Sequence, residues 1–387
     1  MRTVITTERI PIYVWGEIDD EATLAQTRNL ANLPFAHHHV ALMPDAHVGF
    51  GMPIGGVLAA RGQVIPHAVG LDIGCGVRAW KTNVPVADLL PWRDRILNDV
   101  QRSVPQGFEW HKASQADRTD LFDRVPDVGV LRAEVGKAQR QVGSLGGGNH
   151  FLELQVDPQS IVWAMVHSGS RNVGKQMADY YDHIARATNG REHSDVPLPW
   201  GLAHLPVDSV AGSEYLEVMG WCLDFARENR RLMAEDIKTA ISRHFPDIEP
   251  DEELDVHHNY AAVERHFGED VVVHRKGAVH AVGTVFVPGS MGTASYVCEG
   301  RADEDSFESC SHGAGRAMGR KQAVRTIPRE HVLSELAERD VRLFKVKKGN
   351  VAEEAPEAYK DIDQVLEWER ELVEPVVRLV PIGVVKG

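Results

Sequence analysis

Residues 69–77, VGLDIGCGV, hold two side chains that are able to bind a metal, Asp72 and Cys75. The glycines around them permit unusual backbone angles, which predicts an apolar strand ending in a tight, exposed turn. A carboxylate and a thiolate presented together on such a turn could hold a divalent cation. A glycine-rich hairpin around a buried structural cysteine explains these residues at least as well. The choice between these two interpretations depends on whether other parts of the chain supply further metal ligands.

A second glycine-rich stretch, residues 143–154, leads into a strand predicted at 151–156. Its three consecutive glycines allow backbone amides to approach an anion closely, as phosphate-binding loops require. Because side chains alternate along a strand, His150 is expected on one face and Asn149 and Glu153 on the other. His150 could therefore bind a metal while Asn149 and Glu153 face a ligand. A single histidine after a glycine turn is usually structural, but the three polar residues together favour a site.

His167 follows the predicted strand 161–166, at a position where a metal ligand could lie. The next residues nearly match the phosphate-binding pattern G-x-x-x-x-G-K-[ST], with Gly169, Gly174 and Lys175 in register. Gln176 stands where that pattern needs a hydroxyl for magnesium, and no convincing apolar strand ending in a carboxylate supplies the partner. A P-loop nucleotide hydrolase built on residues 169–176 is therefore the alternative from another class of enzyme.

Three later stretches combine polar side chains with extended or small-residue backbone. Residues 255–260 bring His258 and Asn259 after an extended approach, and the strand predicted at 271–273 leads to the adjacent cations Arg275 and Lys276. Small-residue loops can bind phosphates or sugar hydroxyls through amides and hydroxyl donors. Such a loop is predicted at residues 288–296, which include Pro288, Gly289, Ser290, Met291 and Ser295.

His312 lies in a short motif with small residues on its C-terminal side, Gly313, Ala314 and Gly315. Residues 309–316 are expected to open a helix, which would place the imidazole at a helix N-terminus. The helix dipole and free amides favour negative charge there, so a phosphate bound to the imidazole would be well stabilised. The glycine spacing does not make a dinucleotide-binding fingerprint, and no strand leads into it.

The remaining segments give weaker signals. Asp45 and His47 lie in a loop expected at residues 44–56, and a functional role is favoured because the Asp72 motif follows so soon. The histidines at 37–39 are predicted to form a solvent-facing turn, and residues 86–142 a mostly helical scaffold or insertion without chemistry. A helix expected at 213–243 buries Trp221 and Cys222, while its basic stretch at 227–231 is interpreted as a solvated face that could meet a phosphate backbone.

Composition limits the class of protein. The 387 residues are 43% hydrophobic and 25% charged, without a run of about 18 apolar residues or a signal-peptide core, so we expect a cytoplasmic protein. Four cysteines in so long a chain do not form a disulfide framework. The net charge of −14 disfavours nonspecific coating of nucleic acid but permits a local basic groove. Without repeats or linkers, residues 1–387 are predicted to form one large α+β domain of several packed sheets with surrounding helices.

Taken together, nine motifs resemble the RtcB family of RNA-splicing ligases, in order and over essentially the whole chain. They are PDAH at 44–47, DIGCG at 72–76, GGGNHFLE at 146–153, HSGSR at 167–171, HHNY at 257–260, RKGA at 275–278, PGSMG at 288–292, SHGAGR at 311–316 and VKG at 385–387. Each motif alone is weak, but nine in sequence leave little room for chance.

The resemblance implies an enzyme that joins RNA 3′-phosphate or 2′,3′-cyclic phosphate ends to 5′-hydroxyl ends, in tRNA splicing or RNA repair, with GTP and two manganese ions. It implies His312 as the nucleophile that takes GMP from GTP, and an RNA-(3′)pp(5′)G intermediate. The implied metal ligands are Asp72, Cys75 (bridging both ions), His150, His167 and His258. The implied guanylate contacts are Asn149, His150, Glu153, His258, Asn259, Pro288, Gly289, Ser290, Met291, Ser295, His312, Gly313, Ala314, Gly315, Tyr359 (stacking) and Lys386.

Two expectations qualify this resemblance. Thiolate and imidazole ligands would by their softness suggest zinc or iron, so manganese rests on the family alone. Because the chain is acidic overall, local cations would have to form the RNA groove, with Asp45 and His47 supporting the site; the cations are Arg171, Arg275, Lys276 and Arg316. A specialised relative that caps or repairs other nucleic-acid ends is the alternative within the family.

Overall fold

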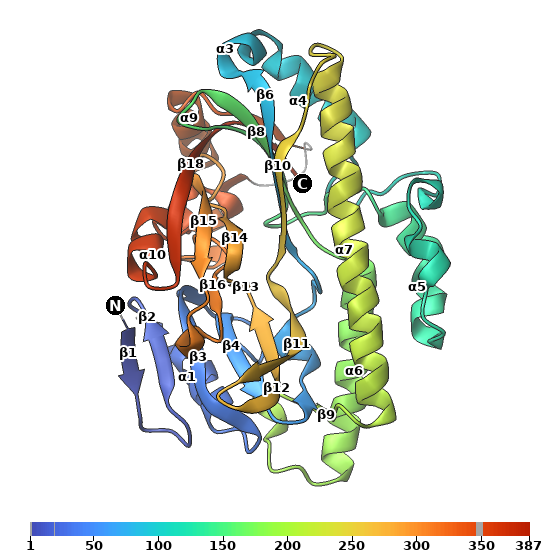
Figure 1. Ribbon diagram of the computed structural model, residues 1–387, viewed down its shortest axis with the longest axis vertical. Coiled ribbons are helices and arrows are strands. Elements are labelled where there is room, and N and C mark those ends of the chain that lie inside the picture. Colours follow the sequence, from blue (N-terminus) through green and yellow to red (C-terminus); the bar gives the residue numbers. More distant parts are fainter. Residues whose placement is uncertain (1, 19, 346–350) are drawn as a thin grey trace.

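A computed structural model describes residues 2–18, 20–345 and 351–387, and two sheets form its centre (Figure 1). The first sheet has the strand order β1-β2-β3-β4-β12-β11 among the described residues. Its strands are β1 (Arg2–Ile5), β2 (Ile12–Trp15), β3 (Ala36–His47), β4 (Ile54–Ala60), β12 (Glu269–Lys276) and β11 (Asn259–His266). Only β2 and β3 pair in parallel, and the other neighbours are antiparallel.

The second sheet has the order β10-β6-β8-β7-β18-β15-β14, and β17 pairs with β18 beside that path. Its strands are β10 (Asp251–His257), β6 (Gly76–Pro85), β8 (Ile161–Ser168), β7 (Phe151–Val156), β18 (Val373–Lys386), β15 (Ser295–Arg301), β14 (Val282–Val287) and β17 (Arg342–Lys345). The first half of β18 pairs with β15 and its second half with β7. The long last strand therefore joins two parts of this sheet.

Helices cover one side of the second sheet, as Figure 1 shows for the long helix α7 (Val210–Ser242). Its buried residues recur at helical spacing and include Trp221 and Cys222, as predicted. The helices α6 (Arg171–Arg191) and α5 (Gly129–Gln141) share an apolar core with α7, whereas α4 (Arg93–Ser103) packs with α7 against the second sheet. No helix among the described residues has the length and apolar character needed to cross a membrane.

The two sheets share a core. Met43 and Val57 of the first sheet lie in one apolar cluster with Val285 and Cys298 of the second. The smaller elements that close this core are α1 (Glu21–Ala31), α2 (Pro66–Val69), α3 (Val86–Leu89), β5 (Gln63–Val64), β9 (Leu205–Pro206), β13 (Ala278–His280), β16 (Ser309–Ser311), α8 (Arg320–Thr326), α9 (Arg329–Glu338) and α10 (Ile362–Trp368). Both helices and sheets build the structure, which confirms the predicted α+β class.

Several predicted elements are confirmed, including the strands at 151–156 and 161–166 and the helical character of 86–142. The predicted loop at 44–56 is wrong in extent, because β3 continues to His47 and β4 begins at Ile54. The solvent-facing histidine turn is also wrong. His37 and His39 are buried within β3, where the ring of His39 stacks between Tyr13 and Phe307.

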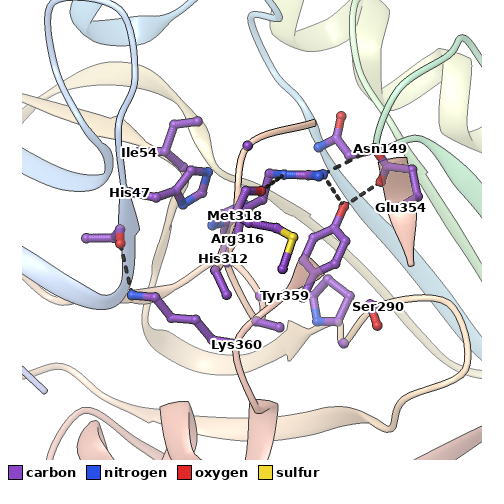
Figure 2. Close-up of a pocket in the computed structure, with 18 of the residues that line it drawn as sticks. His47, Ile54, Asn149, Ser290, His312, Arg316, Met318, Glu354, Tyr359 and Lys360 are labelled. Atoms are coloured by element: carbon purple, nitrogen blue, oxygen red, sulfur yellow. Dashed lines mark hydrogen bonds and ion pairs between the residues drawn. The ribbon is translucent and has the colours of Figure 1, made fainter. Parts of the chain in front are cut away.

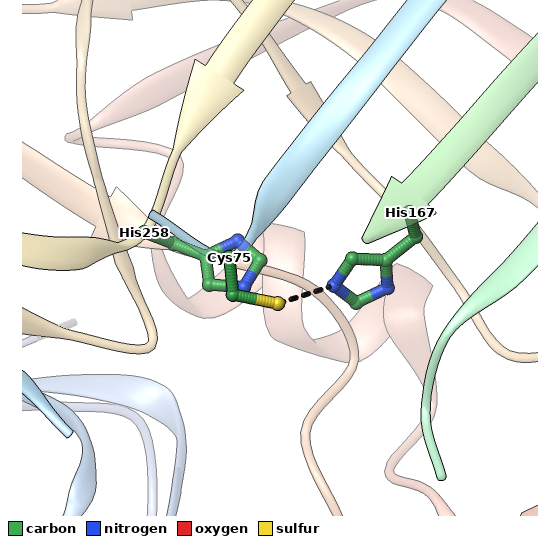
Figure 3. Close-up of side chains that lie close together, drawn as sticks. All are labelled: Cys75, His167 and His258. Atoms are coloured by element: carbon green, nitrogen blue, oxygen red, sulfur yellow. Dashed lines mark hydrogen bonds between the residues drawn. The ribbon is translucent and has the colours of Figure 1, made fainter. Parts of the chain in front are cut away.

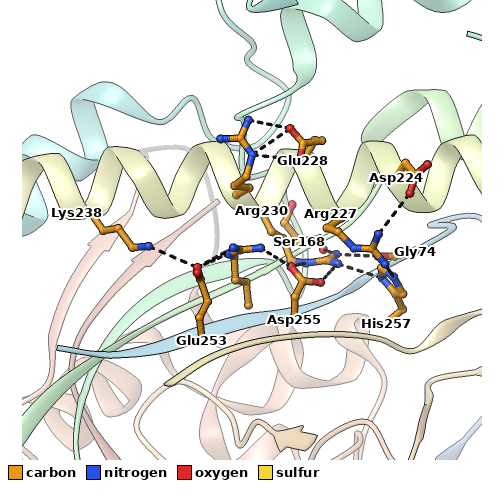
Figure 4. Close-up of polar contacts among 12 residues, drawn as sticks. Gly74, Ser168, Asp224, Arg227, Glu228, Arg230, Lys238, Glu253, Asp255 and His257 are labelled. Carbon is orange, nitrogen blue, oxygen red and sulfur yellow. Dashed lines mark hydrogen bonds and ion pairs between the residues drawn. The ribbon is translucent and has the colours of Figure 1, made fainter. Parts of the chain in front are cut away.

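The basic stretch at 227–231 is not a solvated face throughout. The side chain of Arg230 is completely buried and forms an ion pair with Asp255 of β10 (Figure 4). One of its terminal nitrogens, Nη1, donates to the carbonyls of Gly74 (2.8 Å) and Ser168 (3.0 Å). Burial alone would raise the pKa of Asp255, but Arg230 and its other neighbours hold it below the usual value. One arginine of α7 thus ties together the backbone at the start of β6 and the end of β8.

Replacing Arg230 with methionine is expected to lower the free energy of unfolding by about 3 kcal/mol, because it leaves the buried Asp255 carboxylate without its main partner. Arg78 stays 3.2 Å from Asp255, which keeps the loss near the lower end of the range for broken buried pairs. Arg227→Met is the matched control, since Arg227 is half exposed and pairs with the exposed Asp224. Urea denaturation of both variants measures the difference, and equal midpoints would contradict the prediction.

Candidate active site

Five metal-capable side chains converge where neighbouring strands of the second sheet end. Asp72 and Cys75 lie in a turn between α2 and β6, and the Cys75 amide donates to the Asp72 carbonyl (3.0 Å). His150 directly precedes β7, and His167 is the penultimate residue of β8. His258 lies between β10 and β11, and its backbone amide donates to the Cys75 carbonyl (2.9 Å). The order of the strands in the sheet makes these strand ends neighbours. The strand next to the Asp72 turn is β6, which follows the turn, whereas the sequence predicts a strand that precedes the turn.

The five side chains form two potential metal-binding groups that share the Cys75 sulfur. One group is Asp72, Cys75 and His150, and the other is Cys75, His167 and His258; in each, the ligand atoms lie within 4.8 Å of one another. Figure 3 shows the second group. Cys75 Sγ lies 3.4 Å from His150 Nε2 and 3.5 Å from His167 Nε2. Asp72 Oδ2 lies 2.8 Å from His150 Nε2. Carboxylate, thiolate and imidazole together are suited to divalent transition metals.

The protonation of these groups is compatible with metal binding. His150 Nδ1 donates to the Leu145 carbonyl (2.9 Å), so Nε2 is the ring nitrogen that faces Asp72 and Cys75. Burial, followed by nearby cationic groups, holds the pKa of His167 and of His258 well below the usual value. Burial and then Asp72 raise the pKa of the Cys75 thiol well above its usual value. An ion bound here would therefore have to displace the thiol proton.

Close packing of backbone against the Asp72 carboxylate fixes the first group. A Cβ atom at Gly169 would lie 2.3 Å from both carboxylate oxygens of Asp72, so only glycine fits. The Ser170 amide donates to Asp72 Oδ1 (3.1 Å), and Asn259 Nδ2 donates to the Asp72 carbonyl (3.1 Å). The carboxylate is held in one orientation, with its other oxygen beside His150.

His312 lies next to the second group, after the short strand β16. Its ring centroid is 4.7 Å from that of His258. Its Nδ1 lies 2.6 Å from Oδ2 of the buried Asp45, and its backbone amide donates to the same oxygen (3.2 Å). The carboxylate thus fixes the proton on Nδ1, which leaves the Nε2 lone pair available as a nucleophile. The prediction that His312 opens a helix is wrong, because a bend follows β16 and α8 begins only at Arg320.

A cavity of about 850 Å³ opens beside His312 and His167 (Figure 2). One wall is the loop after β14 and another is the segment that follows His312. The sequence-predicted residues that line it are His47, Asn149, His167, Pro288, Gly289, Ser290, Met291, His312, Gly313, Ala314, Gly315, Arg316, Tyr359 and Lys386. Its volume is that of a site for a nucleotide-sized ligand.

Glu354 organises the floor of this cavity. Glu354 Oε1 lies 3.3 Å from Arg316 Nη1. Glu354 Oε2 lies 3.3 Å from Lys386 Nζ and accepts a hydrogen bond from the Tyr359 hydroxyl. Burial would raise the pKa of Glu354, but Lys386 and then its other partners lower it to about 2. The Arg316 guanidinium also lies over the Tyr359 ring, 4.9 Å from its centroid. The structure therefore holds Lys386, as predicted for a terminal strand that is not frayed.

Five predicted guanylate contacts are not among the residues that line the cavity. His150 and His258 belong to the potential metal-binding groups, whereas Glu153, Asn259 and Ser295 lie behind the cavity wall. Glu153 is buried and accepts Gln155 Nε2, whose other partner is the buried Ser295 hydroxyl (3.0 Å). Burial raises the pKa of Glu153 to about 8. Asn259 braces the Asp72 turn and accepts the Gly277 amide (2.9 Å). These side chains position the walls of the site in this structure.

Two of the four cations expected in an RNA groove are buried, so that part of the prediction is wrong. Arg275 is fully buried, pairs with Glu264 and donates to the Ser309 hydroxyl (2.8 Å). Lys276 donates to the carbonyls of Phe50 (2.7 Å) and His67 (3.0 Å), and burial lowers its pKa to about 8. Arg171 remains beside the glycine loop, and Arg316 faces the cavity.

The P-loop alternative is contradicted by the backbone. Only Gly169 and Ser170 separate β8 from α6, which begins at Arg171. Gly174 and Lys175 therefore lie inside the helix and cannot wrap around a phosphate. Lys175 is half exposed and pairs with Asp179 (2.6 Å) on the same helix.

Sequence reasoning missed several residues of the cavity. Glu354 lies in a stretch without a motif, and its partners Arg316 and Lys386 are far away in the chain. Arg320, Met318, Lys360 and Trp368 also line the cavity. The spacing of Arg316 and Arg320, four residues apart after the His312 motif, is the one signal in the sequence that indicates cations beside His312.

Comparisons with known proteins agree with this arrangement. The family described as "tRNA-splicing ligase RtcB" matches residues 26–135 and 122–387. The RNA-splicing ligase RtcB of Escherichia coli K12 is 34% identical, covering 99% of this chain and 99% of that protein. The tRNA-splicing ligase RtcB of Thermococcus kodakarensis is 33% identical over 98% and 95% of the two chains. The RNA-splicing ligase RtcB of Mycobacterium tuberculosis is 35% identical over 94% and 100%.

Proposed function

This chain belongs to the RtcB family and is an RNA-joining enzyme, and we propose that it seals RNA ends through a guanylylated histidine. Its substrates are ends with a 3′-phosphate or 2′,3′-cyclic phosphate and ends with a 5′-hydroxyl, from tRNA splicing or RNA damage. The observation that supports this mechanism best is the Asp45–His312 pair, since it presents a neutral imidazole nitrogen at the edge of a nucleotide-sized cavity.

His312 Nε2 attacks the α-phosphorus of GTP, and pyrophosphate leaves with the electrons of the broken P–O bond. Asp45 keeps the remaining ring proton on Nδ1 and stabilises the positive charge that develops on the imidazole. The GMP group then passes to the RNA 3′-phosphate, which regenerates His312. The 5′-hydroxyl of the second RNA end finally displaces GMP and closes the strand.

Asp72, Cys75, His150, His167 and His258 are the residues that would hold two divalent ions, with Cys75 common to both. Ions bound there would neutralise negative charge on the reacting phosphates. Nε2 of His150 and Nε2 of His167 face the shared Cys75 sulfur at 3.4 Å and 3.5 Å, so a thiolate and imidazole nitrogens are directed at one place, a donor set that fits divalent ions. Manganese is proposed from family membership, because the donor set alone would also suit zinc or iron.

The guanine nucleotide is proposed to occupy the cavity between the loop after β14 and the Tyr359 ring. Ser290 and the amides of the segment that follows His312 are placed to contact phosphates or sugar hydroxyls, and Tyr359 offers a face for stacking (Figure 2). Lys386 adds a buried positive charge at the cavity floor. Arg171, Arg316 and Arg320 are left as cations for the RNA phosphates.

Covalent labelling tests this mechanism. With manganese and α-labelled GTP, the chain should acquire label through an acid-labile, base-stable bond, and pyrophosphate should be released. His312→Ala should reduce the label to background, and a chase with 3′-phosphate and 5′-hydroxyl RNA should move the label out of the wild-type chain. Label retained by His312→Ala would refute the proposed nucleophile. Competition between cleaved tRNA and other damaged ends separates a splicing enzyme from a specialised end-repair enzyme.

A further inference from the structure

A loop next to the metal ligands presents two aromatic side chains to solvent. Phe108 is fully exposed, and Trp110 is about two-fifths exposed (39%). Burying a phenylalanine side chain ordinarily stabilises a protein, so full exposure of one is unfavourable in itself. Single exposed apolar residues are common on protein surfaces, so exposure alone does not indicate a binding site. The evidence for a site at Phe108 is the position of this residue.

The loop is fixed rather than free. The Gly107 amide donates to the Gly146 carbonyl (2.8 Å), and the Leu145 amide donates to the Pro105 carbonyl (2.9 Å). Arg171 Nη2 donates to the Gly107 carbonyl (3.0 Å). The segment is therefore anchored at Pro105 and Gly107, before Phe108, and also at His111, after it, whose Nε2 lies 3.0 Å from the Gly143 carbonyl at the start of the glycine loop. A rigid platform loses less conformational entropy on binding than a mobile one.

The anchor point adjoins the ligand cluster directly. Gly146 has φ +89°, and a Cβ atom there would lie 2.6 Å from His150 Nδ1 and 2.2 Å from Arg171 Nη1. Two residues further on, a Cβ at Gly148 would lie 3.0 Å from Arg320 Nη2. Gly107, the neighbour of Phe108, is thus hydrogen-bonded to a glycine that contacts Arg171 and the metal-capable His150, and Arg320 lies beside the nearby Gly148.

The charge around the loop suits a phosphate backbone. Arg140 lies over the Trp110 ring, 5.4 Å from its centroid, and Lys112 is exposed on the same loop. Within residues 105–115 Glu109 is the one acidic residue and Lys112 the one lysine, and Arg140 of α5 and Arg171 of α6 add positive charge beside the loop. Exposed aromatic rings combined with cations are the means by which proteins bind single-stranded nucleic acid, since every base has a face that stacks.

We propose that Phe108, supported by Trp110, is a stacking platform for an unpaired RNA base close to the junction being sealed. The inference rests on the proposed RNA-joining function and adds a binding site to it. Stacking would hold the terminal nucleotides against the metal cluster without selecting a base, so the platform favours single-stranded ends over ends held in a duplex.

The test compares Phe108→Ala, Phe108→Tyr and the control Tyr180→Ala, which removes a half-exposed aromatic ring from the outside of α6. Labelling by α-labelled GTP should be equal in all three and in the wild type, because no RNA takes part in that step. In Phe108→Ala, kcat/KM for the ligation of single-stranded ends should fall roughly tenfold to hundredfold, mainly because KM rises. In Phe108→Tyr, kcat/KM should be close to that of the wild type.

Ligation of RNA with an abasic terminal nucleotide tests stacking on Phe108 directly. If Phe108 had a purely structural role, its replacement would not change the effect of removing the base. In the wild type, removal of the base should weaken ligation by a factor similar to the Phe108→Ala loss, and in Phe108→Ala the abasic substrate should cause little further loss. Normal ligation by Phe108→Ala, or an abasic penalty of the same size in both proteins, would overturn the platform. Neither result would affect the guanylylation mechanism, which the His312 labelling experiment tests separately.

Discussion

Guanylylation and ligation are expected to fall by at least roughly a hundredfold in Cys75→Ala, while the chain stays folded. The Cys75 sulfur belongs to both groups of potential ligands, so its removal would weaken the binding of two ions at once. The measurements are manganese content after dialysis, label transferred from α-labelled GTP, and the thermal midpoint. Exhaustive chelation of the wild type should give the same loss of labelling, and added manganese should reverse it only in the wild type.

Cys222→Ala is the control for removing a buried thiol. Cys222 is as inaccessible as Cys75 but lies in the apolar core of α7, among residues without ligand atoms for a metal. It should lose some stability and keep full labelling. If Cys75→Ala unfolded while Cys222→Ala did not, the sulfur would be a structural element of the glycine turn, and the shared-ligand interpretation would fail.

Asp45→Asn is expected to slow guanylylation by roughly 10²- to 10⁴-fold with little change in the apparent affinity for GTP. Asp45 Oδ2 accepts from both the backbone amide and Nδ1 of His312. An amide that turns its NH₂ towards Nδ1 would move the ring proton to Nε2, the atom that has to attack. Single-turnover labelling at saturating GTP measures the effect.

Asp340→Asn supplies the comparison, since Asp340 is an exposed partner of Arg93 and is not among the residues that line the cavity. Its labelling rate should equal that of the wild type. A labelling rate in Asp45→Asn within two- or threefold of the wild type would show that the carboxylate does not set the tautomer of His312. The attacking nitrogen would then have to be assigned again.

The family resemblance implied Asp72, Cys75, His150, His167 and His258 as metal ligands, and the structure brings these five side chains together. Local signals in the sequence single out four of them. Asp72, Cys75, His150 and His167 each follow glycines or end an apolar strand, and strand ends that share a sheet edge come together. The helix expected after His312 failed for the opposite reason. Glycine at 313 and 315 has low helical propensity, and the amide of His312 is satisfied by Asp45 rather than by a helix.

Burial of charge could not be inferred from the sequence. Arg230 and Arg275 look like surface cations, but each has a carboxylate partner on another element, Asp255 and Glu264. A local pattern contains no information about which distant carboxylate a side chain meets. Glu354 was not predicted as a cavity residue for the same reason, since its place in the site depends on an ion pair with Lys386 of β18. The triple histidine was misread because the pairing of β3 is irregular there: His38 has φ +57° and is exposed, whereas His37 and His39 on either side of it are buried.

The position of β18 has a consequence for how the chain reaches its folded state. Until residues 373–386 are available, β7 and β15 lack the partner that joins them, and their unpaired backbone groups are open to pairing with another chain. The partners of β18 are separated from it by long stretches of sequence, which makes its insertion a slow step. During synthesis, a chain that has emerged only as far as β15 is therefore exposed to aggregation, and protection by chaperones is most important until residues 373–386 follow.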